Sequence, residues 1–126
     1  MQIRKLNSTE APEPAGYSQA IEATGGQRIV FVSGQIPVTR ENAVPEGFEA
    51  QCRLAWANVE AQLRAAGMTL DNLVKVTTYL SDREFGLRNR AVRREVLGDR
   101  RPASTVVVAG IFDSAWLLEI EAIAMA

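Results

Sequence analysis

The sequence of 126 residues contains no histidine and only one cysteine. Without histidine the chain lacks the usual general base, the commonest zinc ligand and every serine–histidine or cysteine–histidine nucleophile pair. A hydrolytic triad is therefore excluded. Cys52 alone can form neither an internal disulfide nor a thiolate metal cluster, which is typical of a protein kept in a reducing compartment.

Long apolar runs are missing too. None approaches the roughly 18 residues that span a membrane, and residues 1–6 carry no apolar signal segment. The net charge is −1 at pH 7, so no global attraction draws the protein onto nucleic acid or an anionic membrane. We therefore expect a cytoplasmic protein with no membrane partner. The length predicts a single domain over residues 1–126 that buries roughly two thirds of the surface of the unfolded chain.

Eight segments have the periodicity of regular secondary structure. Strands are predicted at residues 2–6, 17–24, 28–33, 73–80, 105–109 and 116–123, and helices at residues 46–66 and 82–97. In the first helix, apolar side chains recur every three or four residues from Phe48 to Ala66, and Asp82 is the expected N-cap of the second. Gly25-Gly26 predicts a tight hairpin between the second and third strands.

This order of elements predicts an α+β fold in which two helices pack on one face of a mostly antiparallel sheet. The strand at residues 105–109 is apolar on both sides, because Val106 and Val108 point one way and Val107 points the other. The face without helices therefore needs a cover, and at this length we expect another copy of the chain to supply it. Functional sites would then lie between subunits.

Two carboxylates interrupt the last predicted strand. Glu119 and Glu121 are two residues apart, so they share one face of the strand while Leu118, Ile120 and Ala122 share the other. A carboxylate desolvated without a partner costs several kcal/mol. The spacing therefore indicates either a solvated or ion-paired face, or a site that uses the charge.

Basic residues concentrate in and after the second predicted helix. Seven of the 14 fall within 19 positions: Arg83, Arg88, Arg90, Arg93, Arg94, Arg100 and Arg101. They are explained as a solvated face with local pairing to Glu84 and Glu95, or as an RNA-binding surface. The acidic pI and the absence of interleaved aromatic residues argue against the second interpretation.

Four segments, in this order and at these separations, resemble the RidA/YjgF family of reactive-intermediate deaminases. They are Tyr17-Ser-Gln-Ala-Ile, Val32-Ser-Gly-Gln-Ile-Pro-Val, the passage from Asn58 through Ala66-Gly67 and Val74-Lys-Val-Thr-Thr to Asp82, and Arg101-Pro-Ala-Ser followed by Glu119-Ile-Glu-Ala-Ile-Ala. The resemblance implies a chorismate-mutase-like α+β fold and a homotrimer with three clefts at subunit interfaces. It also implies hydrolysis of an imine or enamine, such as 2-iminopropanoate, to a keto acid and ammonia without a cofactor or metal.

The same resemblance assigns roles to individual residues. Tyr17 would border the pocket, and Asn89 would polarise or orient the substrate. Ser33 would hydrogen-bond the substrate, or else satisfy nearby backbone at the strand end. Gly34 follows it in a loop of the kind that approaches ligands closely. Glu119 would hold or activate the attacking water.

The chain departs from the family pattern at the substrate anchor. Where the deaminases have Pro-Ala-Arg-Ser-Cys or Pro-Ala-Arg-Ser-Thr, this sequence has Pro102-Ala103-Ser104-Thr105-Val106. Ser104 thus replaces the arginine that forks onto the substrate carboxylate, a contact worth a few kcal/mol. Arg101 or a helix arginine of a neighbouring subunit are the candidates to replace it. The chain resembles an arginine-lacking branch, whose members are often inactive on 2-iminopropanoate.

Three functions follow from these observations. The first is an enzyme acting on an imine, an enamine or a related small metabolite, with Glu119 and a bound water at its centre. The second is a trimeric binding or regulatory protein whose clefts hold a small ligand, around Glu119, Asn89 and Tyr17, without turning it over. Ser104 and Thr105 are further candidates for contact with the substrate or ligand. The third is an RNA-acting protein, as some relatives are named, which only the arginine cluster supports.

Overall fold

The computed structural model describes all residues from Met1 to Ala126. The elements are β1 (Gln2–Leu6), β2 (Ala20–Thr24), β3 (Ile29–Gln35), α1 (Phe48–Ala65), β4 (Leu73–Leu80), α2 (Gly86–Leu97), β5 (Ala103–Val108) and β6 (Leu118–Met125), with short 3₁₀ turns at Leu70–Asn72 and Arg83–Phe85. All eight predicted elements are present, and the α+β fold class is confirmed.

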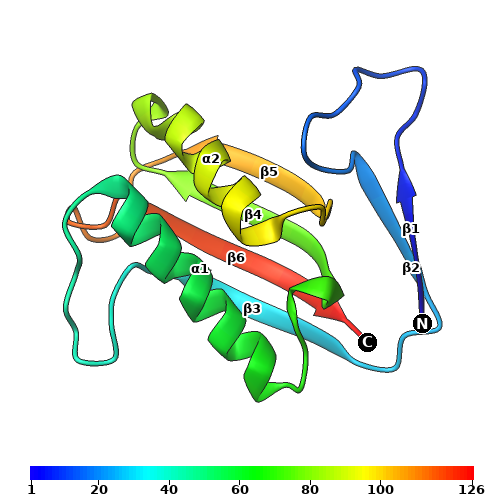
Figure 1. Ribbon diagram of the computed structural model, residues 1–126, viewed down its shortest axis with the longest axis horizontal. Helices are drawn as coiled ribbons and strands as arrows, with labels where there is room; N and C mark the ends of the chain where they lie inside the picture. Colours follow the sequence, from blue (N-terminus) through cyan, green and yellow to red (C-terminus); the bar gives the residue numbers. More distant parts are fainter.

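Four strands form the main sheet, in the order β3-β6-β4-β5. Strand β6 is antiparallel to both of its neighbours, β3 and β4, whereas β5 runs parallel to β4. Both helices lie on the same face of this sheet, α1 over β3 and β6, α2 over β4 and β5 (Figure 1). The opposite face, called the open face below, has no helix over it. No helix is both long and apolar enough to cross a membrane.

The core lies between the helices and the sheet. The predicted period of α1 is confirmed, because Phe48, Cys52, Trp56, Val59 and Leu63 are all buried. Strand β6 alternates as expected, with one set of side chains buried under the helices: Leu118, Ile120, Ala122 and Ala124. The carboxylates of β6 are half-buried on the open face. The expected division of this strand into an apolar and a polar side is therefore confirmed.

The predicted hairpin between the second and third strands is wrong. Strand β2 pairs with β1 in a separate two-stranded sheet, from Gln2 opposite Thr24 to Leu6 opposite Ala20. The β1–β2 hairpin lies beside the main sheet, away from β3 (Figure 1). Strand β2 also begins three residues later than the sequence predicted, at Ala20.

Hydrogen bonds at both ends of β2 explain this arrangement. Before β2, Ser18 N donates to Pro102 O at 3.1 Å, which fixes the incoming chain beside the start of β5. After β2, the amides of Gln27 and Arg28 both donate to Ala126 O at 2.9 Å, so the chain joins β6 at once. Gly25, with φ of 72°, supplies the change of direction. The outer edge of β3 is consequently left unpaired.

One arginine of α2, Arg88, and the acid Glu95 of the same helix form ion pairs, but not as predicted. Glu95 binds Arg53 of α1 at 2.7 Å, and Arg88 binds Glu49 of α1 at 2.6 Å. The expected local pairing within α2 is therefore wrong, because these ion pairs join the two helices instead. Asp82 does cap the chain through Glu84 N, although it caps the 3₁₀ turn, and α2 proper begins at Gly86.

Candidate functional site

Ser33, Gly34 and Glu119 meet on the open face, where the end of β3 lies beside β6. A Cβ at Gly34 would lie 2.5 Å from Glu119 Oε1, so the carboxylate occupies space that only glycine leaves free. Glu119 belongs to none of the four ion pairs of the chain. The result is a half-buried carboxylate without a cation, placed against Gly34 where the register of β3 shifts. Gly34 is thus part of β3 and not of the loop that the sequence predicted.

Polar groups of the neighbouring strands surround these residues. Tyr79, which lies opposite Glu119 in the sheet, donates its hydroxyl to Glu121 Oε1 at 2.8 Å. This hydrogen bond, with partial burial, raises the pKa of Tyr79. Lys75 Nζ donates to Thr105 Oγ1 at 2.5 Å. The open face therefore carries proton donors and acceptors on three adjacent strands, with Thr105 held by a lysine.

A cavity of about 250 Å³ opens on the same face. It is lined by Phe31, Val32, Ser33, Lys75, Thr77, Glu121, Ala122 and Ile123. Of the residues expected at the site it contains only Ser33. Glu121, rather than Glu119, is the carboxylate that borders it.

Asn89 lies on the other side of the sheet, on the buried face of α2. It is only 3% exposed, and its Oδ1 lies 3.7 Å from Cys52 Sγ, which donates a weak hydrogen bond. Burial raises the pKa of this thiol to about 12. Asn89 also lines a cavity of about 390 Å³ together with Val106. Ser104 precedes Val106 by two residues and so shares its face of β5.

Arg93, the one buried arginine, was not singled out by the sequence pattern. It is 8% exposed and belongs to no ion pair, and its Nε has no hydrogen-bond partner. Burial lowers its pKa, as do the positive charges of Arg90, Arg94 and Arg101. Its position four residues after buried Asn89 would have placed it on the inner face of α2. Because this helix has few apolar residues, its inner face could not be recognised from the sequence.

Tyr17 lies near Arg93. The preceding residue, Gly16, passes so close that an added Cβ would be 3.2 Å from Arg93 Nη2. Ser18 fixes this segment by donating its hydroxyl to Arg101 O. The Arg101 guanidinium itself turns away, donating to Gly98 O at 2.9 Å.

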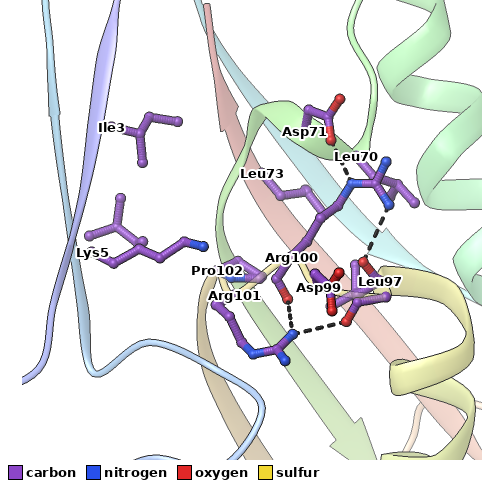
Figure 2. Close-up of a pocket in the computed structure, with 12 residues that line it drawn as sticks. Ile3, Lys5, Leu70, Asp71, Leu73, Leu97, Asp99, Arg100, Arg101 and Pro102 are labelled. Carbon is purple, nitrogen blue, oxygen red and sulfur yellow. Dashed lines mark hydrogen bonds and ion pairs between the residues drawn. The ribbon is translucent and has the colours of Figure 1, made fainter.

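A third cavity, of about 490 Å³, separates the β1–β2 hairpin from the main sheet. Ile3 and Lys5 face across it toward Leu73, Arg100 and Pro102 (Figure 2). Its charged wall is neutralised in part, since the Arg100 guanidinium binds Asp71 at 2.7 Å.

Arg101 is the only expected site residue that borders this third cavity. In Figure 2 the Arg101 side chain is held by main-chain oxygens of its own turn. Within one chain the expected residues thus form two groups. One group lies on the open face: Ser33, Gly34, Thr105 and Glu119. The other group lies on the helix side or beside the start of β5: Tyr17, Asn89, Arg101 and Ser104.

Comparison with known proteins identifies the family. The family model described as endoribonuclease L-PSP matches residues 8–126. A RutC family protein of Pyrococcus horikoshii is 38% identical over 117 residues, which cover 90% of each chain. The Mus musculus protein named 2-iminobutanoate/2-iminopropanoate deaminase is 33% identical over 128 residues, covering 98% of this chain and 92% of its own.

Solved structures agree with this result. The crystal structure of YyfB from Yersinia pestis, described as a protein of unknown function of the conserved Rid family, matches with a TM-score of 0.85 and 25% identity. The match covers 100% of both chains. The chain therefore belongs to the RidA/YjgF family, the family whose model is described as endoribonuclease L-PSP.

Proposed function

We propose that the protein hydrolyses an imine or enamine of a small metabolite to a carbonyl product and ammonia. The observation that carries this proposal is the Glu119 carboxylate, which has no cation and lies against Gly34 at the end of β3. The deaminase name of the Mus musculus relative supports the same chemistry. In this proposal the whole chain acts as one domain in the cytoplasm.

The carboxylate can serve as both base and acid. Glu119 takes a proton from water as the water oxygen adds to the carbon of the protonated C=N bond, which gives a neutral carbinolamine. The carboxylic acid then donates this proton to the amine nitrogen, and the carboxylate takes the proton of the carbinolamine hydroxyl as the C=O bond forms and the C–N bond breaks. The products are the carbonyl compound and ammonia. In this proposal the hydroxyl of Ser33, the residue before Gly34, hydrogen-bonds the substrate.

The active form in this proposal is a homotrimer with clefts between subunits. Large apolar side chains stand uncovered on the open face, including Phe31, which is 74% exposed, and Ile29, which is 52% exposed. Patches of this kind mark interaction surfaces. The two groups of expected residues lie on opposite sides of one sheet, so only a second copy can bring them together.

An RNA-acting function has less support. Phosphate binding needs free cationic side chains. Two of the seven arginines of the basic cluster, Arg88 and Arg100, instead bind carboxylates. The net charge of −1 also gives the whole chain no attraction for a nucleic-acid backbone.

The proposed function is tested by restoring the family arginine. We expect the native protein to hydrolyse 2-iminopropanoate slowly, because Ser104 cannot bind its carboxylate. Ser104→Arg should raise the rate by about tenfold or more, since orienting the substrate supplies several kcal/mol in favourable cases. The assay generates the imine in situ and follows keto-acid release above the spontaneous background.

Glu119→Gln in the Ser104→Arg background is the matched control and should abolish the gain. A Ser104→Arg variant that forms the same oligomer but shows no gain would mean that Ser104 is not the missing anchor. A gain that survives Glu119→Gln would remove the carboxylate from the mechanism.

A further inference from the structure

Arg93 poses a problem that the chain alone does not solve. A buried guanidinium has five N–H donors and a full positive charge, and its desolvation is costly unless an acid and further hydrogen bonds compensate. Arg93 is 8% exposed, has no ion-pair partner, and its Nε has no acceptor. The nearby charges that act on it are also positive, those of Arg90, Arg94 and Arg101. The site therefore has positive charge without an anion to balance it.

We propose that Arg93 is the oxyanion anchor of the cleft and binds the carboxylate of the substrate. The inference rests on the proposed function for the identity of the ligand, but not for the existence of an anion site. The positive charge that this chain lacks at Ser104 then comes from α2.

The cavities beside Arg93 give the anion an approach from two directions. One, of about 390 Å³, has Arg83, Arg90, Arg93 and Val106 in its wall, and Glu84 as its acid. The other, of about 470 Å³, is lined by Gly16, Arg93, Arg94, Leu97, Gly98, Asp99, Arg100 and Arg101. Neither Glu84 nor Asp99 binds a guanidinium, and in each wall arginines outnumber acids. Arg93 is shared by both cavities.

The position of Arg93 suits the substitution at Ser104. Val106 borders the 390 Å³ cavity with Arg93, and Ser104 lies on the same face of β5, one pleat earlier. A guanidinium reaching this space from α2 binds the carboxylate from another direction than one reaching it from β5. The anion is then held but not oriented toward Glu119, so Ser104→Arg still raises the hydrolysis of 2-iminopropanoate. The glycine at position 16 allows the approach, because a Cβ there would crowd Arg93 Nη2 at 3.2 Å.

The test measures anion binding separately from turnover. Pyruvate and inorganic phosphate are titrated into the full-length protein by calorimetry, and melting temperature is followed in parallel. We expect pyruvate to bind and to raise the melting temperature, with chloride competing. Binding of phosphate without pyruvate would overturn the carboxylate assignment, and binding of neither would overturn the site.

Two variants locate the site, and a third controls for charge. Arg93→Met should remove binding while raising the melting temperature of the ligand-free protein, since an unpaired buried charge is replaced by an apolar side chain. Arg93→Lys keeps the charge but loses the planar fork, and should weaken pyruvate binding by about tenfold. Arg64→Met removes one exposed arginine from α1 and should leave binding unchanged.

One result would point to a protein partner for Arg93 instead. If Arg93→Met lowers the melting temperature and dissociates the oligomer, a carboxylate of another copy already occupies the guanidinium, and the proposal fails. Pyruvate binding that depends on Arg93 but is not accompanied by imine hydrolysis would leave this inference intact and refute the proposed enzymatic function.

Discussion

The two faces of the main sheet belong to the same strands but carry different side chains. Under the helices, Leu118 and Ile120 are fully buried and pack against α1. On the open face, alternate residues of the same strand are Glu119 and Glu121, and the edge residue Phe31 is exposed. The difference indicates that the helix face holds the fold together, while the open face is left uncovered for the proposed chemistry and the proposed contact with another copy.

The largest loss of stability should follow from a deletion on the helix face. Trp56 is 1% exposed at the centre of α1, and Trp56→Ala should lower the free energy of unfolding by about 3–5 kcal/mol through lost burial and a cavity. Urea denaturation measures this change. Trp56→Phe should cost less, because it keeps an aromatic ring and removes an indole N–H that has no partner. Equal losses in both variants would contradict this explanation.

A change on the open face should affect assembly rather than folding. Phe31→Ser should shift the protein from trimer toward monomer in light scattering, while the free energy of unfolding of the monomer changes by no more than about 0.5 kcal/mol. Phe112→Ser is the matched control, because Phe112 is 98% exposed in the loop after β5. If both variants stay trimeric, the open face is not the interface.

The smallest effect should come from an ion pair between the helices. Two hydrogen bonds of 2.6 Å from Arg88 hold the pKa of Glu49 at about 2, and Arg88 also lies over the rings of Phe48 and Phe85. Because the pKa of Glu49 is lower in the folded chain, the ion pair stabilises the fold at pH values above the ordinary pKa of 4.5. This contribution is lost as the pH falls toward 2.

Glu49→Gln should therefore flatten the decline of the urea midpoint between pH 5 and about pH 2.5, by a small amount because the pair is exposed. Glu46→Gln, which removes an unpaired exposed carboxylate nearby, serves as the control. An unchanged acid dependence in Glu49→Gln would show that this pair does not contribute to stability.

Local patterns predicted the elements of the fold but not all of their pairings. The burial of α1 and the alternation of β6 follow from short-range periodicity, which the sequence displays directly. The Gly25-Gly26 signal failed because hydrogen bonds from Gln27 and Arg28 to the distant residue Ala126 decide where the chain goes. Turn chemistry describes a local preference and cannot include a partner 99 residues away.

The candidate site shows the same limit. The cost of a carboxylate in an apolar strand drew attention to Glu119 and Glu121 alike, and only the family resemblance favoured Glu119, which lies against Gly34. Arg93 could not be singled out, because an arginine on a helix with few apolar residues is ordinarily solvated. Its burial depends on the Gly16–Tyr17 segment, which leads into a bridge beside the start of β5, a contact between regions far apart in the chain.

The strand order β3-β6-β4-β5 has a consequence for the moment at which the protein can fold. Strand β6 lies between β3 and β4 and pairs with both, so these two strands are not joined in one sheet until Leu118–Met125 is in place. A ribosome delivers both helices and five of the six strands before it delivers this one. The nascent chain therefore leaves the apolar faces of β3 and β4 unjoined throughout synthesis, and the core closes only after translation has passed β6.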